Sequence, residues 1–112
     1  MNEAPSAPAP VILGIDDLRP LPTATRIART SREGVQLLRE HRATRIDELW
    51  LDHDLGGDDD ILPVVTLLEE AAFGGRPFDI GTVLVHSANP VGAATVVQAL
   101  ARWNYRVRRA TA

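Results

Sequence analysis

The chain contains neither cysteine nor lysine, and both absences limit its chemistry. With no cysteine among its 112 residues, disulfide bonds and thiolate catalysis are excluded, and the reducing cytoplasm is the expected location. All 12 basic residues are arginine, so no mechanism can depend on a catalytic lysine. The planar guanidinium group of arginine suits phosphate and carboxylate recognition, although a compositional bias is the commoner explanation of this usage.

Long apolar runs and an excess of positive charge are also missing. No stretch approaches the ~20 apolar residues of a membrane span, so no membrane association is expected. A net charge of −3 argues against binding to duplex DNA. Residues 1–10 lack the basic start and apolar segment of a signal peptide, and their alanine and proline content predicts a disordered tail. Residues 11–112 have a length that suits one domain.

Short apolar runs alternate with helix signals along that domain. Strands are expected at residues 11–15, 25–29, 47–51, 80–85 and 105–108. Helices are expected at residues 30–41, 63–74 and 90–103. This alternation predicts a parallel sheet with right-handed crossovers. We therefore expect an α/β fold, namely a small flavodoxin-like three-layer fold with a five-stranded parallel sheet. Two prolines in residues 18–23 predict that the first crossover helix is reduced to a loop.

Two helix starts carry clear capping signals. Thr30 is followed three residues later by Glu33, which is the spacing of a capping box. Asn89 precedes a proline, and this pair combines a good N-cap with the residue favoured at the first helical position. Both tryptophans, Trp50 and Trp103, are expected in the core.

Acidic residues follow two of the expected strands. Asp16 and Asp17 follow the first, whereas Asp52 and Asp54 follow the third. The carboxyl ends of parallel strands meet at one edge of a sheet, where open α/β sheets bind ligands. Clustered carboxylates repel one another unless a cation or a proton neutralises them, and Mg²⁺ or Mn²⁺ suits such oxygen ligands. The alternative is ordinary turn chemistry, which we expect for the acidic loop 58–60 and the helix start beside it.

Two histidines follow different strands and are expected at the same edge. Near neutral pH, one of His53 and His86 can accept a proton while the other donates one. That pairing suits the opening of a cyclic phosphate ester. The same residues could instead bind Mn²⁺ or Zn²⁺ with the aspartates, or one of them could be an ordinary half-buried side chain.

A phosphate site is predicted beside these groups. The Ser87 hydroxyl, the Asn89 amide and the free N–H groups of the following helix can together hold an anion. Plain helix capping by Asn89 accounts for the same residues. Arg19, which follows the acidic pair, could clamp the phosphate, and a solvated surface position is its alternative.

Three segments carry a resemblance to a known family. They are Leu51-Asp52-His53-Asp54-Leu55-Gly56, His86-Ser87-Ala88-Asn89-Pro90-Val91-Gly92 and Ile15-Asp16-Asp17-Leu18-Arg19-Pro20. With these segments, residues 11 to about 105 resemble the cyclic-phosphate processing receiver-like family.

The resemblance implies a receiver-type sheet with an acidic metal pocket at Asp16, Asp17 and Asp52. It also implies activity on cyclic phosphates through His53, Asp54, His86, Ser87 and Asn89. In the related response-regulator receivers, Asp52 would be the phosphate-accepting aspartate and Ser87 the switch hydroxyl. Those receivers carry a lysine near the fifth strand, and because this chain has none, ordinary phosphoaspartate signalling is not expected.

Two functions follow as hypotheses. The first is metal-assisted hydrolysis of a cyclic phosphate ester on a nucleotide or an RNA end, with His53, His86 and Asp52 as catalytic residues. A phosphate-containing small molecule or an RNA end would then be the partner. The second is a non-enzymatic receiver-like module that senses phosphate or binds another protein. The sequence predicts no oligomeric state.

Overall fold

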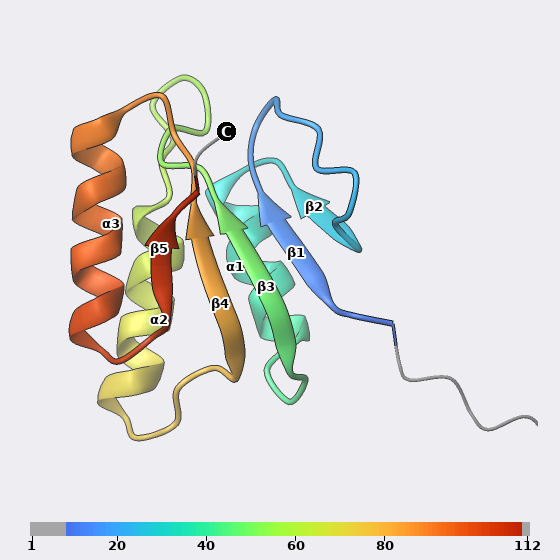
Figure 1. Ribbon diagram of the computed structural model, residues 1–112, viewed down its shortest axis with the longest axis vertical. Coiled ribbons are helices and arrows are strands. Elements are labelled where there is room, and N and C mark those ends of the chain that lie inside the picture. The colour runs from blue at the N-terminus through green and yellow to red at the C-terminus, as the bar shows by residue number, and fades with distance from the viewer. Residues whose placement is uncertain (1–8, 111–112) are drawn as a thin grey trace, which may run out of the picture.

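The computed structural model describes residues 9–110, so most of the predicted tail 1–10 lies outside the described residues. Along these described residues, five strands and three helices follow one another (Figure 1). In order they are β1 (Ile12–Ile15), β2 (Arg26–Ala28), α1 (Ser31–Glu40), β3 (Ile46–Leu51), α2 (Leu62–Phe73), β4 (Ile80–Val85), α3 (Pro90–Arg102) and β5 (Val107–Arg109). Every predicted element is present, although β5 begins two residues later than the sequence predicts. Within this described part, no helix has the length and apolar character needed to cross a membrane.

The five strands form one parallel sheet in the order β2-β1-β3-β4-β5. This agrees with the predicted α/β receiver-like architecture. The chain passes from β1 to β2 through a loop, as the prolines in that segment predict. Parallel pairing brings the carboxyl ends of β1, β3 and β4 to one edge, which we call the carboxyl edge.

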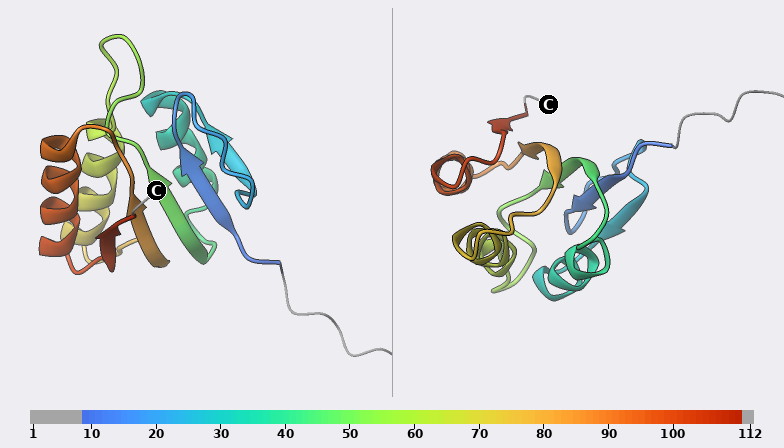
Figure 2. Two further views of the ribbon diagram at one scale, coloured as in Figure 1. Left: turned by 45° about the horizontal axis from the view of Figure 1, so that its top comes forward. Right: turned by 90° about the horizontal axis from the view of Figure 1, so that it is seen from below.

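All three helices lie on the same face of the sheet (Figure 2). The reason is topological, because the chain moves in one direction across the sheet from β2 to β3, β4 and β5. Right-handed crossovers that move in one direction place their helices on one face. Only the step from β1 to β2 moves the other way, and a loop makes it. The predicted three-layer arrangement is therefore wrong, since residues 9–110 form two layers.

The core lies between the sheet and this helix layer. Gly34 allows α1 to pack closely on β1, because a Cβ atom at this position would lie 2.8 Å from Cδ1 of Ile15. Trp103 packs against the core as expected. The expectation for Trp50 is wrong, since this residue is half-buried on the opposite face, where its Nε1 donates to Glu48 at 2.9 Å.

Both predicted helix caps are confirmed. The Thr30 hydroxyl accepts from the Glu33 N–H at 3.1 Å, and the Asn89 side chain accepts from the Gly92 N–H at 3.0 Å. The capping box differs in one detail, because the Glu33 carboxylate accepts from the N–H of Arg29 at 2.9 Å rather than from that of Thr30. These contacts satisfy N–H groups that a helix start leaves unpaired.

The acidic loop between β3 and α2 is more than a solvated turn. The Asp59 carboxylate accepts from the Ser31 N–H at 2.8 Å and from the Ser31 hydroxyl at 2.5 Å. It thus caps α1 from a position 28 residues further along the chain. Asp60 accepts from the Leu62 N–H at 2.9 Å, at the start of α2, as the sequence predicts for this loop. The hydrogen bonds from Ser31 lower the pKa of Asp59.

We predict that Asp59→Ala lowers the free energy of unfolding by about 1–2 kcal/mol, because α1 loses a cap. A group whose pKa is lowered on folding stabilises the fold above its unfolded pKa, and the contribution is lost as pH falls through the folded pKa. Lowering the pH from about 5 to about 3 should therefore reduce the free energy of unfolding more in the native chain than in the variant. Chemical denaturation at each pH measures this difference. Asp58→Ala, an exposed change in the same loop, is the control. Equal pH dependence of the native chain and Asp59→Ala would contradict the assignment.

Candidate metal and phosphate site

Three carboxylates converge at the carboxyl edge. One oxygen atom from each of Asp16, Asp17 and Asp52 lies within 4.8 Å of the other two. Asp16 and Asp17 follow β1 and Asp52 follows β3, and these strands are neighbours in the sheet. The structure thus brings these three residues together, as the sequence predicts. Asp54, the fourth predicted metal ligand, is not in this group.

The β1–β2 loop holds Asp16 in a fixed orientation. Its Oδ1 accepts from the N–H groups of Leu18 at 3.0 Å and Arg19 at 2.8 Å. The guanidinium of Arg29 donates to the carbonyl oxygens of Asp16 at 3.1 Å and Arg19 at 3.3 Å. Sequence reasoning missed Arg29, which follows β2 without any recognisable motif.

The other oxygen of Asp16 faces His86 in a buried setting. Asp16 Oδ2 and His86 Nε2 are 3.3 Å apart, and the two residues are 1% and 3% exposed. Neither atom has a hydrogen-bond partner among the described residues, so the contact has ion-pair distance without hydrogen-bond alignment. Burial lowers the pKa of His86, the charge of Arg19 lowers it further, and Asp16 opposes the shift. The neutral imidazole is therefore favoured.

Asp52 is influenced by the same surroundings. Burial raises the pKa of its carboxyl group, and the nearby charge of Asp16 raises it further. Hydrogen bonds from the Asp54 backbone and the Ser87 hydroxyl act in the opposite direction. Ser87 thus lies beside Asp52, as the sequence predicts. Desolvation and carboxylate repulsion are the conditions that a bound cation relieves.

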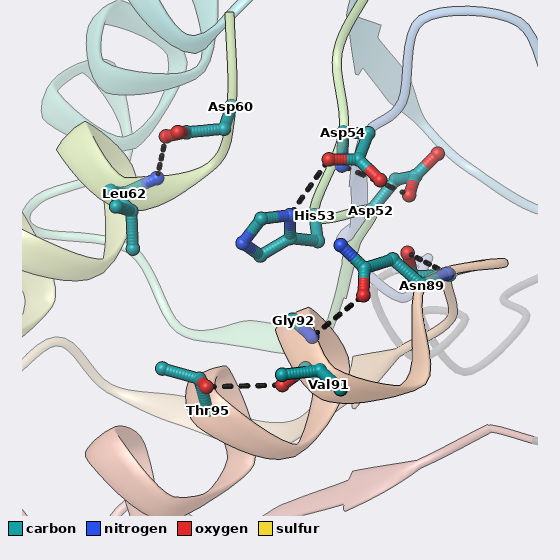
Figure 3. Close-up of polar contacts among 10 residues, drawn as sticks. Asp52, His53, Asp54, Asp60, Leu62, Asn89, Val91, Gly92 and Thr95 are labelled. Atoms are coloured by element: carbon teal, nitrogen blue, oxygen red, sulfur yellow. Dashed lines mark hydrogen bonds and ion pairs between the residues drawn. The ribbon is translucent and has the colours of Figure 1, made fainter.

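His53 belongs to a second group, at the start of α3. Its Nδ1 lies 2.9 Å from the Asp54 carboxylate, which favours a proton on Nδ1 and leaves Nε2 able to accept one. The ring lies over the first turn of α3, where a Cβ atom on Gly92 would be only 2.6 Å from it. Figure 3 shows His53 and Asp52 extending in different directions from one segment. Successive residues of an extended chain point to opposite sides. Since His86 lies on the side of Asp52, His53 and His86 lie in separate surroundings.

The start of α3 lies between these groups. Asn89 is half-buried and caps the helix through Gly92, while its own N–H donates to the Ser87 hydroxyl at 3.0 Å. Figure 3 shows the Asn89 side chain between His53 and Asp52. Arg19 is exposed in the β1–β2 loop, and its charge lowers the pKa of His86. Capping by Asn89 is thus observed, and it leaves the phosphate-binding prediction open.

A comparison with known families bears on this arrangement. The family model of the cyclic-phosphate processing receiver domain matches residues 11–102. The chain belongs to this family. The expectation drawn from the sequence motifs is confirmed, and the parallel sheet agrees with a receiver-like fold. No curated protein and no solved structure matches the chain.

The acidic cluster fits the divalent cation that a receiver-type pocket implies. Its three carboxylates supply the hard oxygen ligands that Mg²⁺ prefers. Within residues 9–110, Asp16 Oδ2 is buried and has no hydrogen-bond partner, which is costly unless another group satisfies it. These observations support a cation at Asp16, Asp17 and Asp52.

We predict that Asp52→Asn weakens Mg²⁺ or Mn²⁺ binding about tenfold or more, a loss of at least about 1.4 kcal/mol. The substitution removes a charged ligand while it preserves size. Isothermal titration calorimetry measures the affinity. Asp54→Asn is the matched control, because Asp54 lies outside the cluster, and its affinity should stay within about twofold of the native value. Equal losses in both variants would contradict the assigned ligand set.

We also predict that Gly92→Ala displaces the His53 ring, because the new methyl group would overlap it. Overpacking of this kind costs about 1–3 kcal/mol. The double variant His53→Ala/Gly92→Ala should recover most of that loss, with a coupling energy above about 0.5 kcal/mol. Chemical denaturation and the His53 ring signals in NMR spectra check both points. Additive effects would show that the two residues do not touch.

Proposed function

We propose that the chain hydrolyses a cyclic phosphate ester at the carboxyl edge of its sheet, with a divalent cation. The single observation that carries the proposal is the convergence of Asp16, Asp17 and Asp52 beside Ser87 and the start of α3. Membership of a family named for cyclic-phosphate processing supports the choice of substrate class. A nucleotide or an RNA end is the proposed carrier of the phosphate.

The cation would be held by the three carboxylates. When bound, it would supply positive charge that stabilises the charge developing on the phosphoryl oxygens. Asp16 is the ligand with the most fixed position, because two backbone N–H groups hold its Oδ1. His86 acts as a positioning residue in this account, since its neutral ring packs against the remaining oxygen of Asp16.

The phosphate would lie between the acidic cluster and the start of α3. The helix dipole favours an anion at this position, although Pro90 has no N–H group and the Gly92 N–H already donates to the Asn89 side chain. The Ser87 hydroxyl and the Asn89 amide are the neighbouring hydrogen-bonding groups. Arg19 is exposed, and its flexible side chain can reach the phosphate from the β1–β2 loop.

In this proposal, His53 transfers the protons. Water attacks phosphorus, the ring P–O bond breaks, and the leaving alkoxide takes up a proton, which gives a monoester and a free hydroxyl group. Asp54 orients the imidazole through Nδ1, and the free Nε2 can transfer protons. His53 is half-buried, so it keeps some access to solvent, whereas His86 is enclosed.

The non-enzymatic alternative makes a different demand on the same site. A phosphate-accepting module would carry a covalent phosphate on Asp52. The chain has no lysine to fulfil the role that this residue has in response-regulator receivers. We therefore treat the alternative as an outcome of the experiment below.

The decisive experiment incubates the protein with 2′,3′-cyclic mononucleotides and with RNA ending in a 2′,3′-cyclic phosphate, in Mg²⁺ or Mn²⁺. Release of the monoester is measured by phosphorus NMR. We expect turnover that Asp52→Asn abolishes and that His53→Gln lowers about 100-fold or more, the usual contribution of a general acid or base. Asp58→Asn, in the exposed loop, should leave the rate unchanged.

Turnover no faster than that of Asp52→Asn would overturn the proposed hydrolysis. A parallel incubation with acetyl phosphate tests the alternative. Mass spectrometry that finds an added phosphate on Asp52, with no ester hydrolysis, would favour the phosphate-accepting module.

A further inference from the structure

A cavity of about 380 Å³ lies where α2 and α3 end, far from the candidate site. Its lining residues are Thr66, Glu69, Glu70 and Phe73 of α2, together with Trp103 at the end of α3. The four α2 residues follow the spacing i, i+3, i+4 and i+7, so they share one face of that helix. In Figure 1 both helices end at the side of the molecule opposite the carboxyl edge. We call this cavity the aromatic corner.

Two aromatic rings meet at a right angle in the aromatic corner. The ring centroids of Phe73 and Trp103 are 5.9 Å apart, and the ring planes are at 87° to each other. Trp103 is half-buried, and its Nε1 donates to Glu69 Oε2 at 3.0 Å, which fixes the indole orientation. The negative face of an aromatic ring attracts a cation that lies within about 6 Å of its centroid. One cation in the cavity can therefore interact with both rings.

The charges around the aromatic corner also favour a cation. Glu69 and Glu70 line the cavity, and neither joins an ion pair within residues 9–110. Arg102, in the last turn of α3, does not line the cavity. Both helices end here, and the C-terminal end of a helix carries partial negative charge. Acidic side chains are common on helix surfaces, and the position of this pair beside two aromatic rings is what distinguishes it.

The walls of the aromatic corner select the kind of cation. A primary ammonium group would turn N–H donors towards ring faces, where they would lose their hydrogen bonds to water. A guanidinium group binds best to a carboxylate with two free oxygens, but one oxygen of Glu69 already accepts from Trp103. A methylated ammonium group presents apolar methyl groups to the rings, while its charge is attracted by the rings and by the glutamates.

We propose that the aromatic corner binds a methylated ammonium group, carried by a small molecule or by a methylated lysine side chain of another protein. Phe73 is 78% exposed, so a ligand of this kind would cover apolar surface that the fold leaves in water. The inference does not depend on the proposed hydrolysis, because the aromatic corner and the carboxyl edge share no residue and lie at opposite ends of the sheet.

The test titrates the protein with choline at constant ionic strength and follows it by NMR. Dimethylbutanol, in which a carbon atom replaces the charged nitrogen, is the matched ligand control. In the Trp50→Phe variant, Trp103 is the one tryptophan of the chain, so a single indole N–H signal reports on the cavity. We expect choline to move this signal, and its own methyl protons to shift upfield because they lie over ring faces. The uncharged control should bind about fivefold or more weakly.

Paired substitutions decide the location. Phe73→Leu/Glu70→Gln removes one ring and one charge at exposed positions, so the fold should persist while choline binding weakens about fivefold or more. Val91→Ala/Asp58→Asn is the matched control, because it changes an exposed apolar residue and an exposed carboxylate outside the cavity. Its affinity for choline should stay within about twofold of the native value.

Peptides with trimethyllysine or unmodified lysine at one position identify the source of the ammonium group. Tighter binding of the methylated peptide than of choline would support a protein partner, and the reverse order would support a small molecule. The proposal is overturned if the Trp103 signal does not move, if dimethylbutanol binds as well as choline, or if methylguanidine binds more tightly than choline. Equal affinities of the two double variants for choline would also overturn it.

Discussion

The parallel orientation of all five strands is the constraint on which the rest of the molecule depends. It brings the carboxyl ends of β1, β3 and β4 together, so residues distant in sequence become neighbours at one edge. The same orientation requires long crossovers between strands, and their fixed handedness collects the helices on one face. One geometric rule thus accounts both for the acidic cluster and for the bare face behind it.

Alternation along each strand divides the chemistry between two sides of the sheet. Asp16, Asp52 and His86 continue the rows of the helix-free face, whereas His53 lies over α3 with Asp54. The first side is desolvated, since burial raises the pKa of Asp52 and lowers that of His86, and it is acidic, since the charge of Asp16 raises the pKa of Asp52 further. The second is closer to solvent and carries the oriented imidazole. Asn89 lies between the two sides and links them through the start of α3.

Local signals in the sequence predicted most of the fold. Thr30 and Asn89 were identifiable as caps because their partners lie three residues away, and the strands because their apolar runs are continuous. The three-layer expectation failed because it followed the familiar receiver arrangement without tracing the direction of each crossover. Trp50 was misassigned because a large aromatic residue in an apolar run suits either face of a sheet.

The candidate site was predictable only where the motif itself lies at a strand end. Asp16, Asp17 and Asp52 lie together as expected. The separation of His53 from His86 was not predicted, because it depends on which side of the pleated backbone each side chain faces. Arg29 and Asp59 act through contacts with distant segments, and no periodicity or spacing in the sequence predicts such contacts. Asp59 in particular joins the loop after β3 to α1, an element that precedes β3 in the chain. That link means the acidic loop cannot swing away without releasing the first turn of α1, so amide hydrogen exchange there would report the position of the loop.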